Sequence, residues 1–494
     1  MNSDVSNPKG RMGFHDLREL MIALEENGQL MRVHERQMPE PDIRGFLRAS
    51  CAMEDEGPAV LFDNIAGYQG KRLLINTHGS WANLAVIFGM PRRTTLRDQF
   101  FEMASRWSRY PGTVRWVTNA PCQQHVIRDN INLYEILPLV RINPYDGGYF
   151  LSKASVISAD ITDPRNFDTQ NIGIYRIQVQ GPDTVGLQAL PFHDMGIHLR
   201  KAEELDRPLP VAICLGAPPA VSFMASACIN YDQSEYKFIE PLTGFPLEVT
   251  KALTSSLDVP AWSEYVIEGH VIPRQRFPEG PFGEFPGTYS GVRGQNRIQV
   301  TAVTHRTDPI METLYIGRPW TEHDCIDGLS TSITLYSQLR QTMPEVTAVN
   351  AMFCHGLTVI VATRNRFGGY AKSVAFRLAS TPHGISYAKN IILVDYDVNP
   401  FDFTAVMTAM STRVRADKDV IVIPHTPGMP LDPASEPPGM GNKLIIDATT
   451  PAPPDRLLRE VRMVGAVPQA EKAAKLIRQF QEEFAGKRHE LVGE

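Results

Sequence analysis

Two glutamates in one short segment are the residues of this sequence best suited to acid–base chemistry. Residues 279–284 read Glu-Gly-Pro-Phe-Gly-Glu. Side chains five positions apart face opposite sides of a strand and lie well apart around a helix. The glycines and the proline break both regular patterns, so we expect a shaped loop. A loop that holds Glu279 and Glu284 near one point can separate their pKa values and create a general acid. The alternative is an exposed turn with two solvated glutamates.

A second segment could contact both ends of a long ligand. Residues 171–176, Asn-Ile-Gly-Ile-Tyr-Arg, are typical of a β-strand with a polar residue at each end. If the strand is extended, Asn171 and Arg176 lie about 16 Å apart, at roughly 3.3 Å per residue. The alternative is a strand whose two polar ends are solvated.

Three dispersed polar residues form a set that suits a divalent cation. Asn171, His193 and Glu235 offer oxygen, nitrogen and oxygen atoms, which suit Mn²⁺ or Mg²⁺ with a phosphate completing the shell. Their spacing alone does not bring them together. Taken singly, His193 reads as a hydrogen-bonded structural histidine and Glu235 as an acid at the start of a helix.

Common cofactor and nucleophile motifs are absent from the sequence. Residues 439–442, Gly-Met-Gly-Asn, lack the third glycine of a dinucleotide fingerprint. Residues 287–291 are one position out of register for a nucleophile elbow. There is no P-loop, H-x-H or H-E-x-x-H motif.

Composition favours a cytoplasmic protein that binds neither nucleic acid nor membrane. The chain has 494 residues and a net charge of −6, with no basic block of the kind that binds nucleic acid. It has no apolar run of about 18 residues, and residues 1–13 lack the apolar core of a signal peptide. Its six cysteines are scattered without a C-x-x-C pair, which favours reduced thiols over a disulfide or zinc framework.

Hydrophobic periodicity predicts three globular regions. Residues 1–115 mix a helix at 16–27 with short buried strands at 59–62 and 72–75, which predicts an N-terminal α/β domain. Residues 116–312 are rich in short strands around one helix at about 194–205, which predicts a barrel or sandwich. The expected strands of this region are 156–159, 172–179, 210–215, 265–271 and 297–303.

The last part of the chain begins with a linker, residues 313–343, in which 330–342 are expected to be helical. Residues 344–450 alternate between strands and helices, which predicts a C-terminal α/β domain. Its expected elements are strands 358–363, 390–395 and 419–424 and helices 371–379 and 401–411. The tail, 451–494, carries an apolar helical face that packs either within its own chain or on a second subunit. This face comprises Ala473, Leu476, Ile477, Phe480 and Phe484.

In combination, four segments resemble the UbiD-like decarboxylase family. They are residues 171–176, 234–236, 279–284 and 389–395, and the resemblance runs from Asp16 to Thr449. Three further segments resemble the branch that decarboxylates 4-hydroxybenzoate, vanillate, protocatechuate or gallate without oxidation: 146–150, 231–236 and 317–322. One departure is Ile239-Glu240, where the family often has Ala-Gly.

The resemblance implies a mixed α/β fold, with a central split β-barrel like that of flavin reductases. This barrel binds prenylated FMN and is flanked by N- and C-terminal α/β regions and a C-terminal helix. A separate flavin prenyltransferase supplies the cofactor, with Mn²⁺ or Mg²⁺ and, in some members, a monovalent cation such as K⁺. The implied reaction is the reversible, non-oxidative loss of CO₂ from an aromatic acid. Relatives are usually homo-oligomers, dimers or hexamers, and small companion subunits are possible partners.

The resemblance also assigns residues. The catalytic trio falls on Arg176, Glu279 and Glu284, and the metal ligands fall on Asn171, His193 and Glu235. Lys389 falls where the family has a lysine that contacts the phosphate. The implied cofactor-binding residues are Asn171, Ile172, Gly173, Ile174, Tyr175, Arg176, Phe192, His193, Glu235 and Lys389.

These roles agree with the chemistry of the reaction. Direct loss of CO₂ from an sp² ring carbon would leave an unstabilised carbanion, which a cofactor acting as an electron sink avoids. Arg176 can bind a carboxylate with two donors, Glu279 can pair with Arg176, and Glu284 can deliver the proton that replaces CO₂. A para hydroxyl, once deprotonated, pushes electrons into the ring. His323 is either the partner of that hydroxyl or a structural histidine.

Three other functions stay open. The chain could be a non-catalytic flavin-binding subunit of a multi-subunit aromatic carboxylase, although its complete catalytic trio favours an enzyme. It could decarboxylate a non-phenolic aromatic, heteroaromatic or α,β-unsaturated acid. An ordinary flavin reductase would require a nicotinamide site, for which the sequence has no motif.

Overall fold

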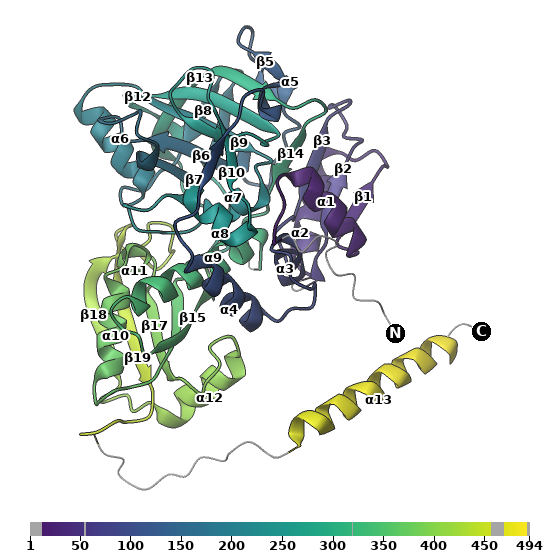
Figure 1. Cartoon of the computed structure of the whole chain (residues 1–494). Helices are drawn as coiled ribbons and strands as arrows, with labels where there is room; N and C mark the ends of the chain where they lie inside the picture. Colours follow the sequence, from purple (N-terminus) through teal and green to yellow (C-terminus); the bar gives the residue numbers. More distant parts are fainter. Residues whose placement is uncertain (1–11, 54–55, 319, 456–468, 492–494) are drawn as a thin grey trace. The chain divides into compact units, whose positions relative to one another are not determined.

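The computed structural model describes residues 12–53, 56–318, 320–455 and 469–491 (Figure 1). By internal contacts it divides into two units, Met1–Thr450 and Pro451–Glu494. All the strands in the described part of the chain lie in the first unit. In the described part of the chain, no helix is both long enough and apolar enough to cross a membrane.

The first sheet confirms the short strands expected at 59–62 and 72–75. Its strand order is β1-β2-β3-β14. Asp16 caps the helix in front of this sheet, its carboxylate accepting the Glu19 N–H at 2.8 Å. The fourth strand comes from residues 310–313, which the sequence analysis divided between the barrel and the linker. The elements of this region are α1 (Leu17–Glu26), β1 (Leu30–Val33), α2 (Arg44–Cys51), β2 (Ala59–Phe62), β3 (Arg72–Ile75), α3 (Trp81–Ile87), α4 (Leu96–Trp107) and β14 (Ile310–Thr313).

The central region is a closed six-stranded barrel, as the resemblance implied. Its strands run β12-β9-β6-β7-β8-β13, and β12 also pairs with β13, which closes the ring. The barrel strands pair antiparallel, and their inward residues form one of the main hydrophobic cores. The elements are β5 (His125–Ile127), β6 (Tyr149–Ala159), β7 (Gln170–Gly181), β8 (Thr184–Leu187), α6 (Asp194–Glu204), β9 (Leu209–Leu215), β12 (Tyr265–Glu279) and β13 (Arg293–His305).

Strand β12 is longer than the expected 265–271. Its pairing with β13 shifts register between Val271 and Arg276 and then continues to Glu279, opposite Arg293. The strand therefore ends at Glu279, and Gly280, with a left-handed φ of 92°, begins the loop that carries Glu284. One glutamate thus lies on a strand end and the other on the loop that follows it.

Smaller elements surround the barrel. Strand β10 joins the other two strands of a three-stranded sheet, parallel to β4 and antiparallel to β11. The short helix η5 begins at Glu235, one of the expected metal ligands. These elements are β4 (Val114–Trp116), α5 (Leu133–Ile136), α7 (Pro219–Met224), η5 (Glu235–Phe238), α8 (Ile239–Thr243), β10 (Leu247–Lys251) and β11 (Asp258–Pro260).

The third sheet confirms the expected strands and helices of the C-terminal region and adds two strands, β15 and β19. Its order is β15-β16-β17-β19-β18, with a parallel centre β16-β17-β19. Helix α9 begins at Glu322, earlier than the expected residue 330, so that it includes His323. The elements are α9 (Glu322–Arg340), β15 (Val346–Phe353), β16 (Thr358–Thr363), α10 (Tyr370–Ala379), α11 (Pro382–Ser386), β17 (Asn390–Asp395), α12 (Phe403–Arg413), β18 (Val420–Pro427) and β19 (Met440–Ala448).

The second unit contains the expected terminal helix, α13 (Ala470–Leu491). Its apolar side chains Leu476, Ile477 and Phe480 are 59%, 59% and 67% exposed. The side chain of Phe484 lies outside the described residues. A role for this helix in joining subunits stays a prediction.

Candidate active site

One cavity is lined by the barrel on one side and by elements of the C-terminal region on the other. Six consecutive residues of β7, 171–176, line it. The barrel side adds Phe192, His193 and Glu284, and the other side adds His323 and further residues named below.

Arg176 lies between the two glutamates that the sequence analysis singled out. Its Nε and Nη2 donate to the Glu279 carboxylate at 2.9 and 2.6 Å. Its Nη1 contacts Glu284 Oε1 and donates to Ser290 Oγ at 3.2 Å. All three charged side chains are at most 7% exposed. The trio implied by the resemblance is therefore one buried cluster.

The two glutamates differ in what they face. Glu279 is fully buried behind Arg176, whereas Glu284 lines the cavity with Arg176 and Phe282. Burial lowers the pKa of Arg176, and the Glu279 carboxylate opposes that shift. Glu284 is thus the carboxylate that can reach a bound molecule, and Glu279 is the one that holds the guanidinium in place.

Asp146 fixes the loop that carries Glu284, a role that the sequence analysis did not foresee. One carboxylate oxygen accepts the Gly283 N–H at 2.8 Å and the other accepts the Asn143 N–H at 2.7 Å. Burial raises the pKa of Asp146 to about 6, although these two hydrogen bonds act in the opposite direction. The loop is therefore anchored one residue before the acid that faces the cavity.

The opposite end of the β7 segment is rich in oxygen atoms. Asn171 Nδ2 lies 3.2 Å from Glu235 Oε1 and 3.4 Å from Asp194 Oδ2, while the other Glu235 oxygen accepts the Ile172 N–H at 3.2 Å. Burial raises the pKa of Glu235 to about 8 and that of Asp194 to about 6. Among the described residues, no lysine or arginine forms an ion pair with either acid. Such a site suits an added cation.

His193 lines the same cavity, at the residue before α6. Its Nε2 is 3.1 Å from Tyr387 Oη. Burial lowers the pKa of His193 to about 4, so that the ring is neutral, as a metal ligand must be. Asn171 and Glu235 are thus in contact, and His193 lines the same cavity with one ring nitrogen on a tyrosine.

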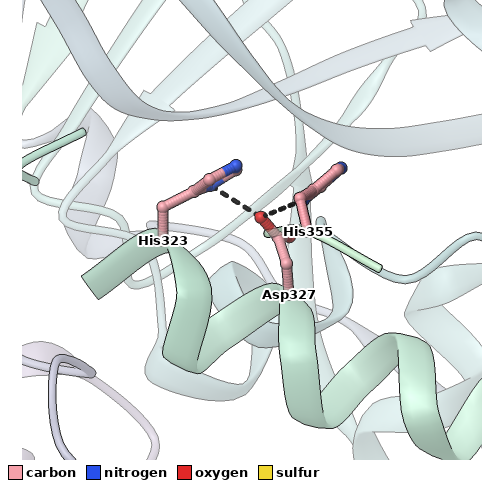
Figure 2. A group of neighbouring side chains, drawn as sticks. All are labelled: His323, Asp327 and His355. Atoms are coloured by element: carbon pink, nitrogen blue, oxygen red, sulfur yellow. Dashed lines mark hydrogen bonds and ion pairs between the residues drawn. The ribbon is translucent and has the colours of Figure 1, made fainter. Parts of the chain in front are cut away.

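His323 belongs to a pair of histidines that share one carboxylate (Figure 2). His323 and Asp327 project from neighbouring turns of α9, and His355 approaches from the turn after β15. Asp327 Oδ2 lies 2.6 Å from Nδ1 of His323 and 2.9 Å from Nδ1 of His355. The imidazole rings stack with centroids 4.9 Å apart and planes inclined by 12°. We call His323 and His355, together with the carboxylate of Asp327 that joins them, the imidazole pair.

The contact between His323 and Asp327 shifts the pKa of both groups. Burial by itself would raise the pKa of Asp327, but the two imidazoles outweigh it and hold that pKa below its usual range. Burial likewise opposes the effect of Asp327 on His323, and the net pKa of His323 is raised. Since Asp327 engages both Nδ1 atoms, the Nε2 side of each ring is left for the cavity that all three residues line.

Sequence reasoning missed three polar cavity residues from the C-terminal region: Asp327, His355 and Tyr387. Asp327 had a usable signal, because it lies four residues after His323 and thus on the same face of a helix. His355 had none, since it lies in a turn with a left-handed φ of 54°.

Lys389 does not line the cavity. Its Nζ forms an ion pair with Asp432 at 2.7 Å, and its side chain is 36% exposed. The other nine expected cofactor-binding residues all line the cavity.

A buried ionic cluster supports the first turn of α9. Lys153 Nζ, from β6, lies 2.6 Å from Glu312 Oε1 of β14 and 2.6 Å from Glu322 Oε1 of α9. It also lies 3.0 Å from His78 Nδ1. The charged side chains are at most 1% exposed. The cluster joins the barrel, the first sheet and the helix turn that carries His323.

Comparisons with known proteins cover nearly the whole chain. The N-terminal, Rift-related and C-terminal domain models of 3-octaprenyl-4-hydroxybenzoate carboxy-lyase, the UbiD protein, match residues 22–103, 115–319 and 324–448. Over 455 residues the chain is 51% identical to a phenolic acid decarboxylase of Sedimentibacter hydroxybenzoicus, covering 91% of this chain and 95% of that protein.

Solved structures agree with this match. The closed form of vanillic acid decarboxylase from Sedimentibacter hydroxybenzoicus has a TM-score of 0.90 at 50% identity, covering 95% of this chain and 99% of that one. An evolved dimeric form of the UbiD-class enzyme HmfF from Pelotomaculum thermopropionicum, in complex with prenylated FMN, has a TM-score of 0.76 at 28% identity, covering 93% and 98%.

Proposed function

Because this chain belongs to the UbiD family of carboxy-lyases, we propose that it reversibly removes CO₂ from a hydroxylated benzoic acid with prenylated FMN as cofactor. Its activity as an aromatic-acid decarboxylase follows from its close similarity to a phenolic acid decarboxylase. One observation carries the finer proposal. A single β7 segment has Arg176, held between two glutamates, at one end and an oxygen-rich, cation-poor group at the other.

The cavity residues fit a flavin mononucleotide. The segment 171–176 spans about 16 Å, at roughly 3.3 Å per residue, and each of its six residues contributes to the lining of the cavity. At its polar end, Asn171 Oδ1 is buried without a hydrogen-bond partner, as expected of an atom reserved for an ion. Asn171, His193 and Glu235 would hold Mn²⁺ or Mg²⁺ against the cofactor phosphate. When bound, the cofactor supplies an electron sink for the ring carbon that loses CO₂.

The residues of the chain bind the acid and move one proton. Arg176 donates to the carboxylate of the substrate, and Glu279 keeps the guanidinium oriented from behind. Glu284 gives its proton to the ring carbon after CO₂ leaves. Phe282, Phe285 and Ile316 line the same cavity and exclude water from the reacting carbon.

The imidazole pair is proposed to bind the para hydroxyl. Nδ1 of His323 is fixed by Asp327, so that the opposite edge of the ring can face the cavity that His323 lines. A protonated His323 stabilises the phenolate form of the substrate, in which electrons flow toward the carbon that accepts the proton. His355, held by the same carboxylate, can contact the same end of the ring.

We therefore predict a preference for para-hydroxylated benzoates, which depends on His323. Reconstituted protein should turn over 4-hydroxybenzoate, vanillate or protocatechuate far faster than benzoate or a cinnamate. His323→Ala should lower kcat/KM for the phenolic acids by roughly 10²-fold or more, the usual range for a positioned acid or base. His34→Ala, at an exposed histidine, is the control. Equal turnover of benzoate by the wild type would refute the preference.

We predict that the protein loses its flavin when it loses the cation. Glu235→Ala or His193→Ala should lose bound flavin as well as metal, because the ion links protein oxygens to the phosphate. Flavin absorbance and metal content of the purified variants measure the two quantities independently. A metal-free variant with a full complement of flavin would contradict the bridging role.

Purified protein loaded with prenylated FMN and given no other protein tests the whole proposal. Release of CO₂ from 4-hydroxybenzoate or vanillate under these conditions identifies this chain as the catalyst. Release only after a second protein is added would instead make it one subunit of a larger enzyme.

The exposed apolar stripe of α13 supports a homo-oligomer.

A further inference from the structure

Asp194 is a second carboxylate at the polar end of the cavity, and neither the resemblance nor the comparisons assign it a role. It is the first residue of α6, and its side chain lines the cavity. An acid in the first turn of a helix is often there only to complement the helix dipole. Asp194, however, contacts a residue of the barrel, with Oδ2 3.4 Å from the amide nitrogen of Asn171 on β7.

The Asn171 side chain projects between two acids. Its Nδ2 lies 3.2 Å from Glu235 and 3.4 Å from Asp194, while its Oδ1 is buried without a partner. An ionised carboxylate only accepts hydrogen bonds, so the amide turns its donor toward the acids and leaves its acceptor orphaned. The donor nitrogen therefore occupies the direction from which a cation would be bound. Rotation of the amide by half a turn would bring Oδ1 to face the same ion.

We propose that Asp194 is a further ligand of the divalent cation, completing with Asn171 and Glu235 a three-oxygen protein site to which His193 adds a nitrogen. The proposal rests on the cation site described under the proposed function. Three oxygens with two formal negative charges suit Mn²⁺ or Mg²⁺. They also give the protein a set of ligands of its own. Hence the flavin-free protein binds Mn²⁺ before any phosphate is present.

The test is a titration of flavin-free protein with Mn²⁺, followed by the electron paramagnetic resonance signal of the free ion. Wild type should bind Mn²⁺, and Asp194→Asn should raise Kd by about 10–100-fold, the loss typical of removing a group that supports a metal ion. Glu235→Gln is the positive reference. Asp168→Asn, whose side chain is 59% exposed in an ion pair with Lys237, is the matched control and should leave Kd unchanged.

A second measurement separates binding from folding. The rise in unfolding temperature on adding Mn²⁺ reports affinity by mass action, whatever the stability of the metal-free variant. This rise should shrink in Asp194→Asn and stay unchanged in Asp168→Asn.

Three results would overturn the proposal. Wild-type affinity in Asp194→Asn, together with weakened binding in Glu235→Gln, would remove Asp194 from the site and leave the cation site standing. Wild-type affinity in both variants would remove the cation site itself. No binding of Mn²⁺ by flavin-free wild type would show that the protein oxygens do not form a site without the cofactor.

Discussion

Glu284→Gln is expected to lower the rate of decarboxylation by roughly 10²–10⁴-fold, the usual effect of losing a positioned general acid. Glutamine keeps the shape of the side chain and can still accept a hydrogen bond from Arg176 Nη1. It has no proton to give to the ring carbon. Flavin binding should persist, because the substitution leaves the oxygen-rich end of β7 untouched.

Exchange of hydrogen in D₂O distinguishes loss of the proton donor from general damage. Wild type should exchange the ring hydrogen of the phenolic product, since this exchange is protonation run in reverse. Glu284→Gln should lose exchange and turnover together. Glu248→Gln is the control, because Glu248 is a partly buried acid outside the cavity that accepts from Trp262 at 2.6 Å. Wild-type exchange in Glu284→Gln would mean that the proton comes from another group.

Lys153→Met is expected to destabilise the first unit by about 3–5 kcal/mol, the range for removing one partner of a buried ion pair. The substitution keeps most of the side-chain volume and removes the ammonium. Glu312 and Glu322, which are at most 1% exposed, would then be buried without their counter-charge. Urea unfolding followed by circular dichroism measures the change in midpoint at constant slope.

Two variants test the reason for this loss. Replacing Glu312 and Glu322 by glutamine in the Lys153→Met background should recover part of the stability, because no charge is then left unpaired. Lys237→Met removes an exposed pairing with Asp168 and should change stability by no more than about 1 kcal/mol. Similar losses in Lys153→Met and Lys237→Met would mean that the buried cluster contributes only as much as a surface pair.

Local patterns in the sequence were sufficient for elements that are either strongly periodic or bounded by turn residues. Strands β2 and β3 lie on the expected residues because each is a short apolar run. The second half of β12 was missed because it is polar, contains Pro273 and Pro278, and is exposed over most of its length. A strand of that kind is held by its partner β13, which no local pattern can reveal.

The candidate site required more than local pattern. Arg176 and Glu279 are 103 positions apart, and their strands β7 and β12 are not neighbours in the barrel. Their contact depends on the closure of the sheet into a barrel. The spacing of the two residues in the sequence therefore could not predict this contact, whereas the family resemblance could. His355 was missed for a related reason. Its place in the site depends on its contact with Asp327, a residue of a different element, and its own sequence position carries no periodic signal.

In the proposed mechanism, the position of Arg176 between two acids links the binding of substrate to the protonation of Glu284. Glu284 and the carboxylate of the substrate would both accept from Arg176 Nη1. Two neighbouring carboxylates also repel each other. By this mechanism the arriving anion would favour the protonated form of Glu284, so that the acid carries its proton when substrate is bound. The CO₂ that forms is neutral and no longer competes with Glu284 for the Arg176 donor. The guanidinium is then free to recover Glu284 as a carboxylate, which favours transfer of the proton to the ring. In the carboxylation direction the order is reversed. Glu284 takes up the ring hydrogen as a proton, and the carboxylate formed from CO₂ replaces Glu284 on Arg176.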